Sequence, residues 1–114
     1  MKIALLQNPL KQTGLTDWGA PEEMLEGDSK TRGMLLHKGE DGQSECGYWE
    51  CTPGHWRCEV MRDEFCHFLE GEAHYEHDDG EVIRVGPDTA AFFPAGWIGS
   101  CRVTRSLKKV YMIR

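Results

Sequence analysis

The sequence has little positive charge, and what it has is not concentrated. Thirteen Lys and Arg residues stand against nineteen Asp and Glu, which leaves a formal net charge of −6 at pH 7. The basic clusters, Lys108-Lys109 and Arg102/Arg105, are short and near the C-terminus. Because phosphate backbones and anionic membranes are bound by clustered cations, we expect neither nucleic acid nor a membrane as a partner.

Long apolar runs and paired cysteine motifs are also missing. The longest apolar run near the start, Ile3 to Leu6, is too short for a signal-peptide core or a membrane span. The five cysteines are odd in number and form no C-x-x-C pair, which is typical of reduced thiols and argues against a disulfide framework or a zinc knuckle. These absences predict a cytoplasmic protein, and 114 residues fit one domain.

From residue 33 onward, turn-forming Gly, Pro and Asp residues separate short segments of strand-forming residues. Such spacing is typical of an all-β sandwich or barrel. The expected strands cover residues 34–38, 45–52, 55–62, 65–69, 73–77, 82–85, 90–93, 101–104 and 110–113.

Residues 1–32 have a different pattern, with isolated apolar residues and one helix-like turn. In that turn Pro21 pre-sets the backbone and Gly27 can end it. We therefore expect an arm over residues 1–32, with at most a short helical turn, packed on a barrel of residues 33–114 or on a partner subunit.

The expected strand over 55–62 has two unlike faces. Its even positions are Trp56, Cys58, Val60 and Arg62, and its odd positions are His55, Arg57, Glu59 and Met61. Since alternate residues of a strand point to opposite faces, the pattern alone places the mostly apolar even set in the core and the mostly polar odd set in water.

Four segments in order along the chain resemble the small single-domain cupins, and in particular the cupin domain of (S)-ureidoglycine aminohydrolase. The resemblance extends from about Trp18 to Ile113, and it implies a jelly-roll β-barrel, or double-stranded β-helix, around an inner pocket. In cupins that pocket commonly holds a divalent metal, so Mn, Fe, Zn or Ni is the cofactor to consider. The four segments are Trp49–Gly54, Asp63–Gly71, Phe92–Trp97 and Lys108–Tyr111.

The cupin metal motifs are only partly present. Glu64 and Gly71 match the Glu and the closing Gly of the first motif, and Pro94 and Gly96 match the second. The first Gly of the second motif falls on Asp88, which tolerates a left-handed backbone, and its His falls on Gly99. The two His of the first motif fall on Arg57 and Glu59 with the longer spacer, or on Cys58 and Val60 with the shorter one. Of four expected ligands only Glu64 remains, so no metal site is predicted.

In the longer register, Arg57 would take the place of the metal between Glu59 and Glu64, because buried carboxylates need a positive partner. Two interpretations remain open for this cluster. It is an ion-pair network without activity, or Arg57 binds a small carboxylate or polar ligand while Glu64 orients it or acts as a catalytic base.

Three further residues are candidates for contact with a ligand. His55 lines the pocket mouth or lies on the surface after the Pro53-Gly54 turn. Cys66 shares the parity of Glu64 and points inward, as a small buried hydrophobe or as a thiolate. Trp97, directly after the Pro-Ala-Gly turn, could stack on a flat ligand at the pocket rim.

If Arg57 and Glu59 point inward, then Trp56, Cys58 and Val60 form an outward apolar stripe that needs a cover. Together with the resemblance, this predicts a homodimer that buries the stripe. Three functions follow for the whole chain: a cupin that binds a small polar or carboxylate-bearing metabolite, a divalent-metal hydrolase of a ureide-like C–N bond, or a dimeric structural module with a closed interior.

Overall fold

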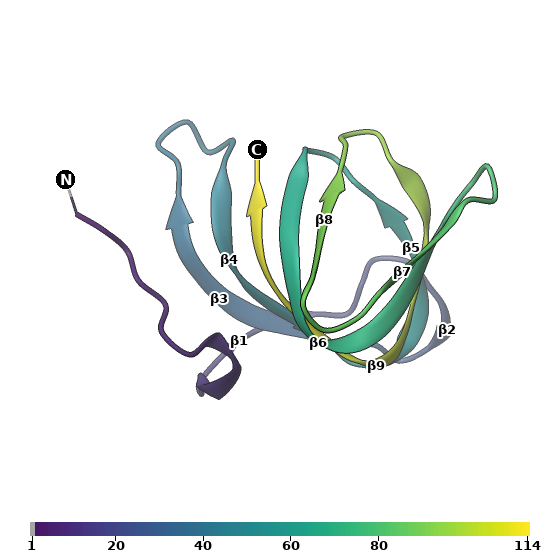
Figure 1. The fold of residues 1–114 in the computed structure, drawn as a ribbon, viewed down its shortest axis with the longest axis horizontal. Coiled ribbons are helices and arrows are strands. Elements are labelled where there is room, and N and C mark those ends of the chain that lie inside the picture. The colour runs from purple at the N-terminus through teal and green to yellow at the C-terminus, as the bar shows by residue number, and fades with distance from the viewer. Residues whose placement is uncertain (1) are drawn as a thin grey trace.

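The computed structural model describes residues 2–114 and is almost entirely β-structure, as Figure 1 shows. One short 3-10 helix, η1 (Pro9–Lys11), precedes nine strands in the described residues. The all-β prediction is therefore confirmed. The strands are β1 (Thr16–Gly19), β2 (Met24–Gly27), β3 (Thr31–Lys38), β4 (Glu45–Cys51), β5 (Gly54–Glu59), β6 (Glu64–His77), β7 (Val82–Val85), β8 (Thr89–Phe93) and β9 (Ile98–Ile113).

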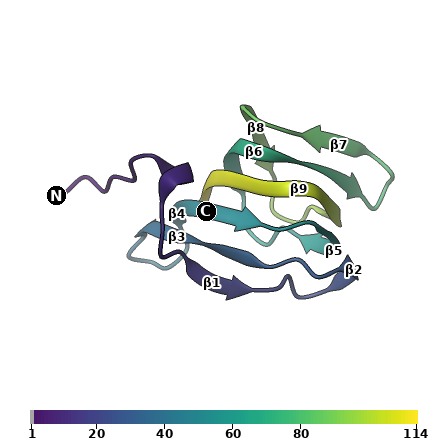
Figure 2. The same cartoon turned by 90° about the horizontal axis from the view of Figure 1, so that it is seen from below.

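All nine strands belong to one antiparallel sheet that curls around an interior (Figures 1 and 2). The long strand β9 pairs with β4, β5 and β6, so it joins both sides of the barrel. Strands β7 and β8 extend the sheet beyond β6, and β3 extends it beyond β4. Within residues 2–114 no helix is long and apolar enough to cross a membrane.

The sharp bend that β6 makes over β9 depends on Gly71. This residue has φ +96, and a Cβ atom built on it would lie 2.2 Å from the Ser106 carbonyl oxygen. The pairing register shifts several times between Phe68 and Ala73, which lets the strand turn a corner without ending. The Glu70-Gly71-Glu72 turn expected from the sequence is therefore a bend inside a single strand.

The N-terminal segment adds strands to the barrel. Strand β1 pairs with β3 and β2 pairs with β5, and the Arg57 amide donates to the Glu23 carbonyl at 2.9 Å. The expectation of at most one short helical turn in residues 1–32 is confirmed by η1 (Pro9–Lys11). Its expected place between Pro21 and Gly27 is wrong, because the exposed edge of β5 offers that segment backbone partners. Residue 32 falls within β3, and the division into an arm and a barrel stays a prediction.

Candidate functional site

The even positions of β5 and the loop after it point into the barrel. Trp56 and Val60 are buried, and both line an inner cavity together with Cys58. The prediction from alternation alone is therefore correct, and the outward apolar stripe expected from the longer cupin register is wrong. The shorter register, which puts Cys58 and Val60 at the two histidine positions, is the one that the barrel adopts.

Arg57 lies on the opposite face of β5, outside the barrel. Its guanidinium donates to both carboxylate oxygens of Asp78, at 2.9 and 3.1 Å, and lies 4.0 Å from Glu23. Hydrogen bonds from Arg57 lower the pKa of Asp78. The expected Arg57/Glu59/Glu64 cluster therefore does not form, because the turn after β6 supplies Arg57 with a bidentate partner. Glu59 is exposed at the mouth of the inner cavity.

The positive charge beside Glu64 belongs to Lys109 on β9. The Lys109 Nζ lies 2.5 Å from Glu64 Oε2, and the lysine is only 8% exposed. The ammonium also lies 4.5 Å from the centroid of the Trp49 ring, a distance at which a cation is attracted to the ring face. The barrel thus does hold a cation against its motif carboxylate, and that cation is an ammonium.

Lys109 is fixed in its charged form. Burial is the largest single influence and would lower its pKa, but the charge and hydrogen bond of Glu64, together with the nearby Cys66 and Cys58, outweigh burial and raise the pKa above its ordinary value. An ammonium has three N–H donors, and one of them is donated to Glu64. Within residues 2–114 no second acceptor lies within hydrogen-bond distance of Nζ, so the remaining donors are free for another oxygen.

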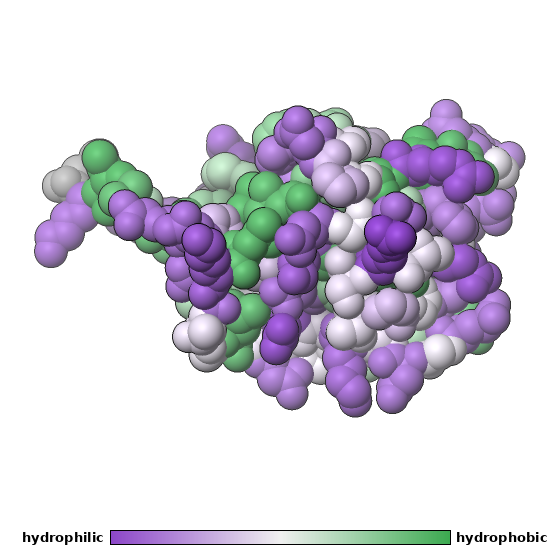
Figure 3. All heavy atoms as spheres, turned by 60° about the horizontal axis from the view of Figure 1, so that its bottom comes forward, coloured by the Kyte–Doolittle hydropathy of each residue, from purple (hydrophilic) through white to green (hydrophobic). Residues whose placement is uncertain are grey.

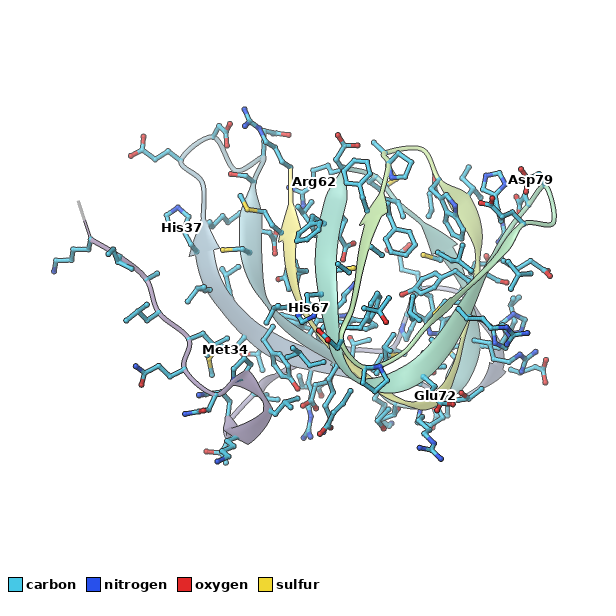
Figure 4. All side chains as sticks on the ribbon, viewed as in Figure 1. Met34, His37, Arg62, His67, Glu72 and Asp79 are labelled. Carbon is cyan, nitrogen blue, oxygen red and sulfur yellow. The ribbon has the colours of Figure 1, made fainter. Side chains whose placement is uncertain are left out.

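Two cavities meet at this ion pair. The first has a volume of about 310 Å³ and the second about 240 Å³, and both are lined by Trp49, Glu64, Lys109 and Ile113. The first also has aromatic walls from Trp56, Tyr75 and Phe93. Arg62, labelled at the rim in Figure 4, lines its mouth and lies 3.5 Å from Glu45.

The second cavity is closed on one side by Trp18 of β1. The Trp18 ring lies against the bare Cα of Gly33, where a Cβ atom would come within 2.4 Å of the ring. Glu45 and Tyr111 complete this cavity, and the Tyr111 hydroxyl donates to Glu45 at 3.0 Å. A segment expected to be a separate arm therefore contributes a wall to the interior.

The inward cysteines Cys66 and Cys101 are buried and Cys58 is partly buried, and all three act as small hydrophobes with protonated thiols. Burial raises the pKa of Cys58 and of Cys66 to about 11, and it also raises the pKa of Cys101. Cys66 is fully buried, as its parity with Glu64 predicted, and its Sγ lies 3.8 Å from the Ala91 carbonyl oxygen. A thiolate at these positions is disfavoured at neutral pH.

The two remaining candidates lie away from the inner cavities. His55 is on the outer face of β5, with Nδ1 3.1 Å from Arg102 and 3.6 Å from Glu26, so the surface alternative is the one that forms. Trp97 packs edge-on against Tyr75 and Phe93, with ring centroids 6.0 and 5.8 Å away. It supports the aromatic wall from behind, and stacking of Trp97 on a ligand stays a prediction.

The residues at the four metal-ligand positions do not fit a divalent ion. They are Cys58, Val60, Glu64 and Gly99, and Glu64 already faces an ammonium. A Cβ atom at Gly99 would lie 2.1 Å from the Glu76 carbonyl oxygen and 2.7 Å from the Trp97 ring, so no imidazole fits there. Among residues 2–114, no group of three or more His, Cys, Asp or Glu side chains is placed to hold a metal ion.

Lys109 is the site residue that the sequence analysis missed. In the sequence it stands beside Lys108 in a short basic cluster, yet it occupies the inward phase of the alternation Leu107, Lys109, Tyr111, Ile113. A lysine in the apolar phase of a strand is the signal that could have found it.

A curled antiparallel sheet around an aromatic-lined pocket is the architecture of the cupin class, and solved structures agree. A protein of unknown function from Pseudomonas syringae pv. tomato, of the DUF861 family, matches with a TM-score of 0.81 at 19% identity, over 90% of this chain and 45% of that one. The chain therefore spans less than half the length of that protein. The predicted jelly-roll barrel is confirmed.

The family is given by the sequence itself. The EutQ-like cupin domain family matches residues 38–111, and the chain belongs to this family. The Clostridium difficile EutQ protein matches with a TM-score of 0.65 at 17% identity, over 75% of this chain and 68% of that one. The Schizosaccharomyces pombe Cnp3 cupin domain matches with a TM-score of 0.66 at 14% identity, over 91% of this chain and 69% of that one. At such identities the structures share the fold alone, and no curated protein matches the sequence.

Proposed function

We propose that the barrel binds a small, uncharged polar molecule at the Lys109–Glu64 pair, without a metal ion. The observation that carries this proposal is a buried ammonium with unused N–H donors where two cavities meet. A polar group of the ligand would accept from Lys109 in a site from which most water is excluded. Such a hydrogen bond is stronger than it would be at the surface.

The hydrogen-bond donors and acceptors of the Lys109–Glu64 pair determine which head group the ligand carries. Lys109 offers N–H donors, and Glu64 uses Oε2 for Lys109, which leaves Oε1 as an acceptor. The two charges sum to zero, so a charged ligand would enter without a counter-charge of its own. A carboxamide has an acceptor oxygen beside a donor N–H₂ group, and it complements both residues at once.

The size and lining of the larger cavity determine the rest of the ligand. Trp49, Trp56, Tyr75 and Phe93 face the larger cavity, whose volume of about 310 Å³ is at the low end for small-molecule sites. Aromatic walls favour flat, apolar groups. Benzamide therefore combines the proposed head group with a body of suitable size, and it is a practical probe.

Binding of benzamide, benzoate and benzylamine, measured by titration calorimetry and by thermal shift, tests the proposal. The three probes share a ring and differ only in the charge of the head group. We expect benzamide to bind at least tenfold more tightly than either charged probe, and Lys109→Met to abolish its binding. Arg57→Ala is the matched control, since this cation lies outside the barrel, and it should bind like the wild type.

Each other result has a defined meaning. Preference for benzoate would return the site to the carboxylate-binding function first expected for the barrel. Equal loss of binding in Arg57→Ala and Lys109→Met would show that the inner cation is not the binding group. If none of the three probes binds, the proposal fails and a structural module with a closed interior is favoured.

The hydrolase of a ureide-like C–N bond, similar to (S)-ureidoglycine aminohydrolase, is the second function and needs a divalent ion that the donor set at Glu64 does not fit. Metal analysis of protein purified without chelator distinguishes the two functions. Near-stoichiometric Mn, Fe, Zn or Ni would favour the hydrolase. A cytoplasmic location is part of the proposal, and it is supported by the absence of disulfides among the five cysteines, all of which are described.

A further inference from the structure

A recess lies in the side of the barrel where β2 leaves the edge of β5. Its volume is about 470 Å³, and we call it the side recess. It extends from the segment before β2, across the end of β5, to the start of β9. Among the residues that line it are Glu22, Glu23, Arg57, Glu59, Met61 and Ile98.

The side recess exists because β2 covers only part of β5. The pairing of the two strands ends at Met24, and one further hydrogen bond follows, from the Arg57 amide to the Glu23 carbonyl. Pro21 has no N–H group and cannot continue this ladder. Since alternate residues of an antiparallel strand turn their N–H groups to the same side, the Glu59 amide faces the recess with no strand beside it. An open strand edge of this kind can pair with an extended peptide.

The rim of the side recess is acidic. Glu22 and Glu59 are exposed, and within residues 2–114 neither takes part in an ion pair. Arg57 is the single cation among the described residues that line the recess, and its guanidinium already contacts Asp78 and Glu23. Four carboxylates, those of Glu22, Glu23, Glu59 and Asp78, therefore stand against one guanidinium. The recess is suited to a basic group and not to an acidic one.

The same end of the molecule carries further negative charge. Asp78 lies in the turn after β6, and its amide donates to the Ile98 carbonyl at 3.1 Å, which holds the turn beside the recess. Asp79, labelled in Figure 4, and Glu81 follow it, and both are exposed. Figures 1 and 2 show β2, β5 and this turn at the end opposite the N-terminus, and Figure 3 shows mostly hydrophilic residues there. A basic partner would therefore be attracted to this end before contact.

Two apolar side chains of the recess are also open to solvent. Met61 is 75% exposed and Ile98 is 37% exposed. Single exposed apolar residues are ordinary, but these two lie in one recess among carboxylates. A small hydrophilic cation would gain nothing from them, whereas a basic side chain next to an apolar one would use both kinds of contact.

We propose that the side recess binds an extended segment of a partner protein, in which a Lys or Arg side chain lies beside an apolar one. The carboxylates of the rim pair with the basic group, Met61 and Ile98 cover the apolar one, and the open edge of β5 holds the backbone. This site is separate from the Lys109–Glu64 pair, so it does not depend on whether the barrel binds benzamide.

Short peptides that are blocked at both ends test this site. Lys-Leu-Lys-Leu-Lys carries three positive charges, and Ser-Leu-Ser-Leu-Ser has the same leucine spacing without charge. By titration calorimetry, we expect the basic peptide to bind at least tenfold more tightly than the neutral one, and less tightly at high salt. Glu22→Gln/Glu59→Gln should weaken its binding at least fivefold. The Glu59 amide should exchange its hydrogen more slowly in the complex.

Glu40→Gln/Asp41→Asn is the matched control, since it removes two negative charges from exposed residues of the β3–β4 loop, away from the recess. This variant should bind the basic peptide like the wild type. Equal loss of binding in the two double variants would show that the peptide responds to net charge alone, and would overturn the site. Equal binding of the two peptides, or no binding of either, would also overturn it.

Spermidine separates a peptide partner from a free polyamine. It carries the same three positive charges as the basic peptide, but it has neither leucine side chains nor a peptide backbone. We expect it to bind at least tenfold more weakly than the peptide. Binding as tight as that of the peptide would assign the recess to a polyamine and overturn the proposed protein partner.

Discussion

A lysine inside a β-barrel is energetically costly unless its charge is matched, and here one carboxylate and one aromatic ring do this. Glutamate and lysine side chains are almost never buried unless they are paired, and Glu64 and Lys109 form such a pair. Together they leave a neutral pair, and the Trp49 ring face lies against the ammonium at 4.5 Å. The two charges depend on each other, so the loss of either leaves the other uncompensated.

Removing only one member of this pair should therefore cost more than removing both. We predict that Lys109→Met lowers the free energy of unfolding by about 3 kcal/mol, because the Glu64 carboxylate, whose side chain is only 17% exposed, is left without a partner. The double variant Lys109→Met/Glu64→Gln should recover most of this loss. Urea unfolding measures all three proteins.

Lys108→Met is the matched control for that experiment. Lys108 pairs with Glu70 at 3.1 Å, and the Glu70 side chain is half exposed. Exposed pairs contribute less than about 1 kcal/mol, so the control should be nearly as stable as the wild type. A Lys109→Met variant as stable as this control would show that Glu64 does not depend on Lys109.

At this scale the sequence predicted the kind of site but not its cation. Glu64 and the inward Cys66 could be found from motif position and parity. The prediction that Arg57 points into the barrel is wrong. The cupin spacer allows two registers that differ by one residue, and a shift of one residue turns every side chain of the strand to the other face. The alternation of Trp56, Cys58 and Val60 already favoured the correct register. Lys109 is distant in sequence from Glu64, so only the pairing of β6 with β9 brings the two together.

Among the elements, β9 shows how close packing decides which residues a position accepts. Gly99 lies between the backbone of Glu76 and the Trp97 ring, and its place in the cupin motif is that of a metal-binding His. The packing around Gly99 therefore excludes a histidine at this position, because the neighbouring strand approaches too closely for any side chain.

We predict that Gly99→Ala lowers the free energy of unfolding by about 2 kcal/mol, because the added methyl group forces β6 and β9 apart. Gly86→Ala is the control. The nearest atom to a Cβ there is the Gly71 carbonyl oxygen at 3.9 Å, and the backbone of Gly86 is not left-handed. Thermal unfolding of both variants checks this, and equal melting temperatures would contradict it.

The sequence predicted local strands well and their continuity poorly. Turn residues correctly marked most breaks, but β6 runs through Glu70-Gly71-Glu72 and β9 joins two segments expected to be separate. A glycine between strand-forming residues signals either a turn or a bend, and only the neighbouring strand decides which. The segment around Pro21 resembled a helix for the same reason, since its partner β5 is not adjacent in sequence.

For the whole molecule, the buried thiols make stability depend on alkaline pH. Burial raises the pKa of Cys58, Cys66 and Cys101 in the folded state, whereas the same thiols in the unfolded chain titrate near 8.5. Above that pH the unfolded chain binds fewer protons than the folded one, so the free energy of unfolding falls as pH rises. Their contribution is complete below about pH 8 and is lost progressively toward pH 11.

We predict that the free energy of unfolding is about 2 kcal/mol lower at pH 10 than at pH 7 for each such thiol. Urea unfolding under reducing conditions at pH 7, 9 and 10 measures the slope. Cys58→Ala should reduce it. A stability that stays constant from pH 7 to 10 would contradict the protonated state of these thiols.

The central place of β9 also affects how the protein can be made. Strands β4, β5 and β6 all pair with it, yet it is the last of the nine strands to leave the ribosome. Until residue 98 and those after it emerge, three earlier strands have unpaired edges. The barrel therefore closes late in synthesis, and the nascent chain exposes open sheet edges until then.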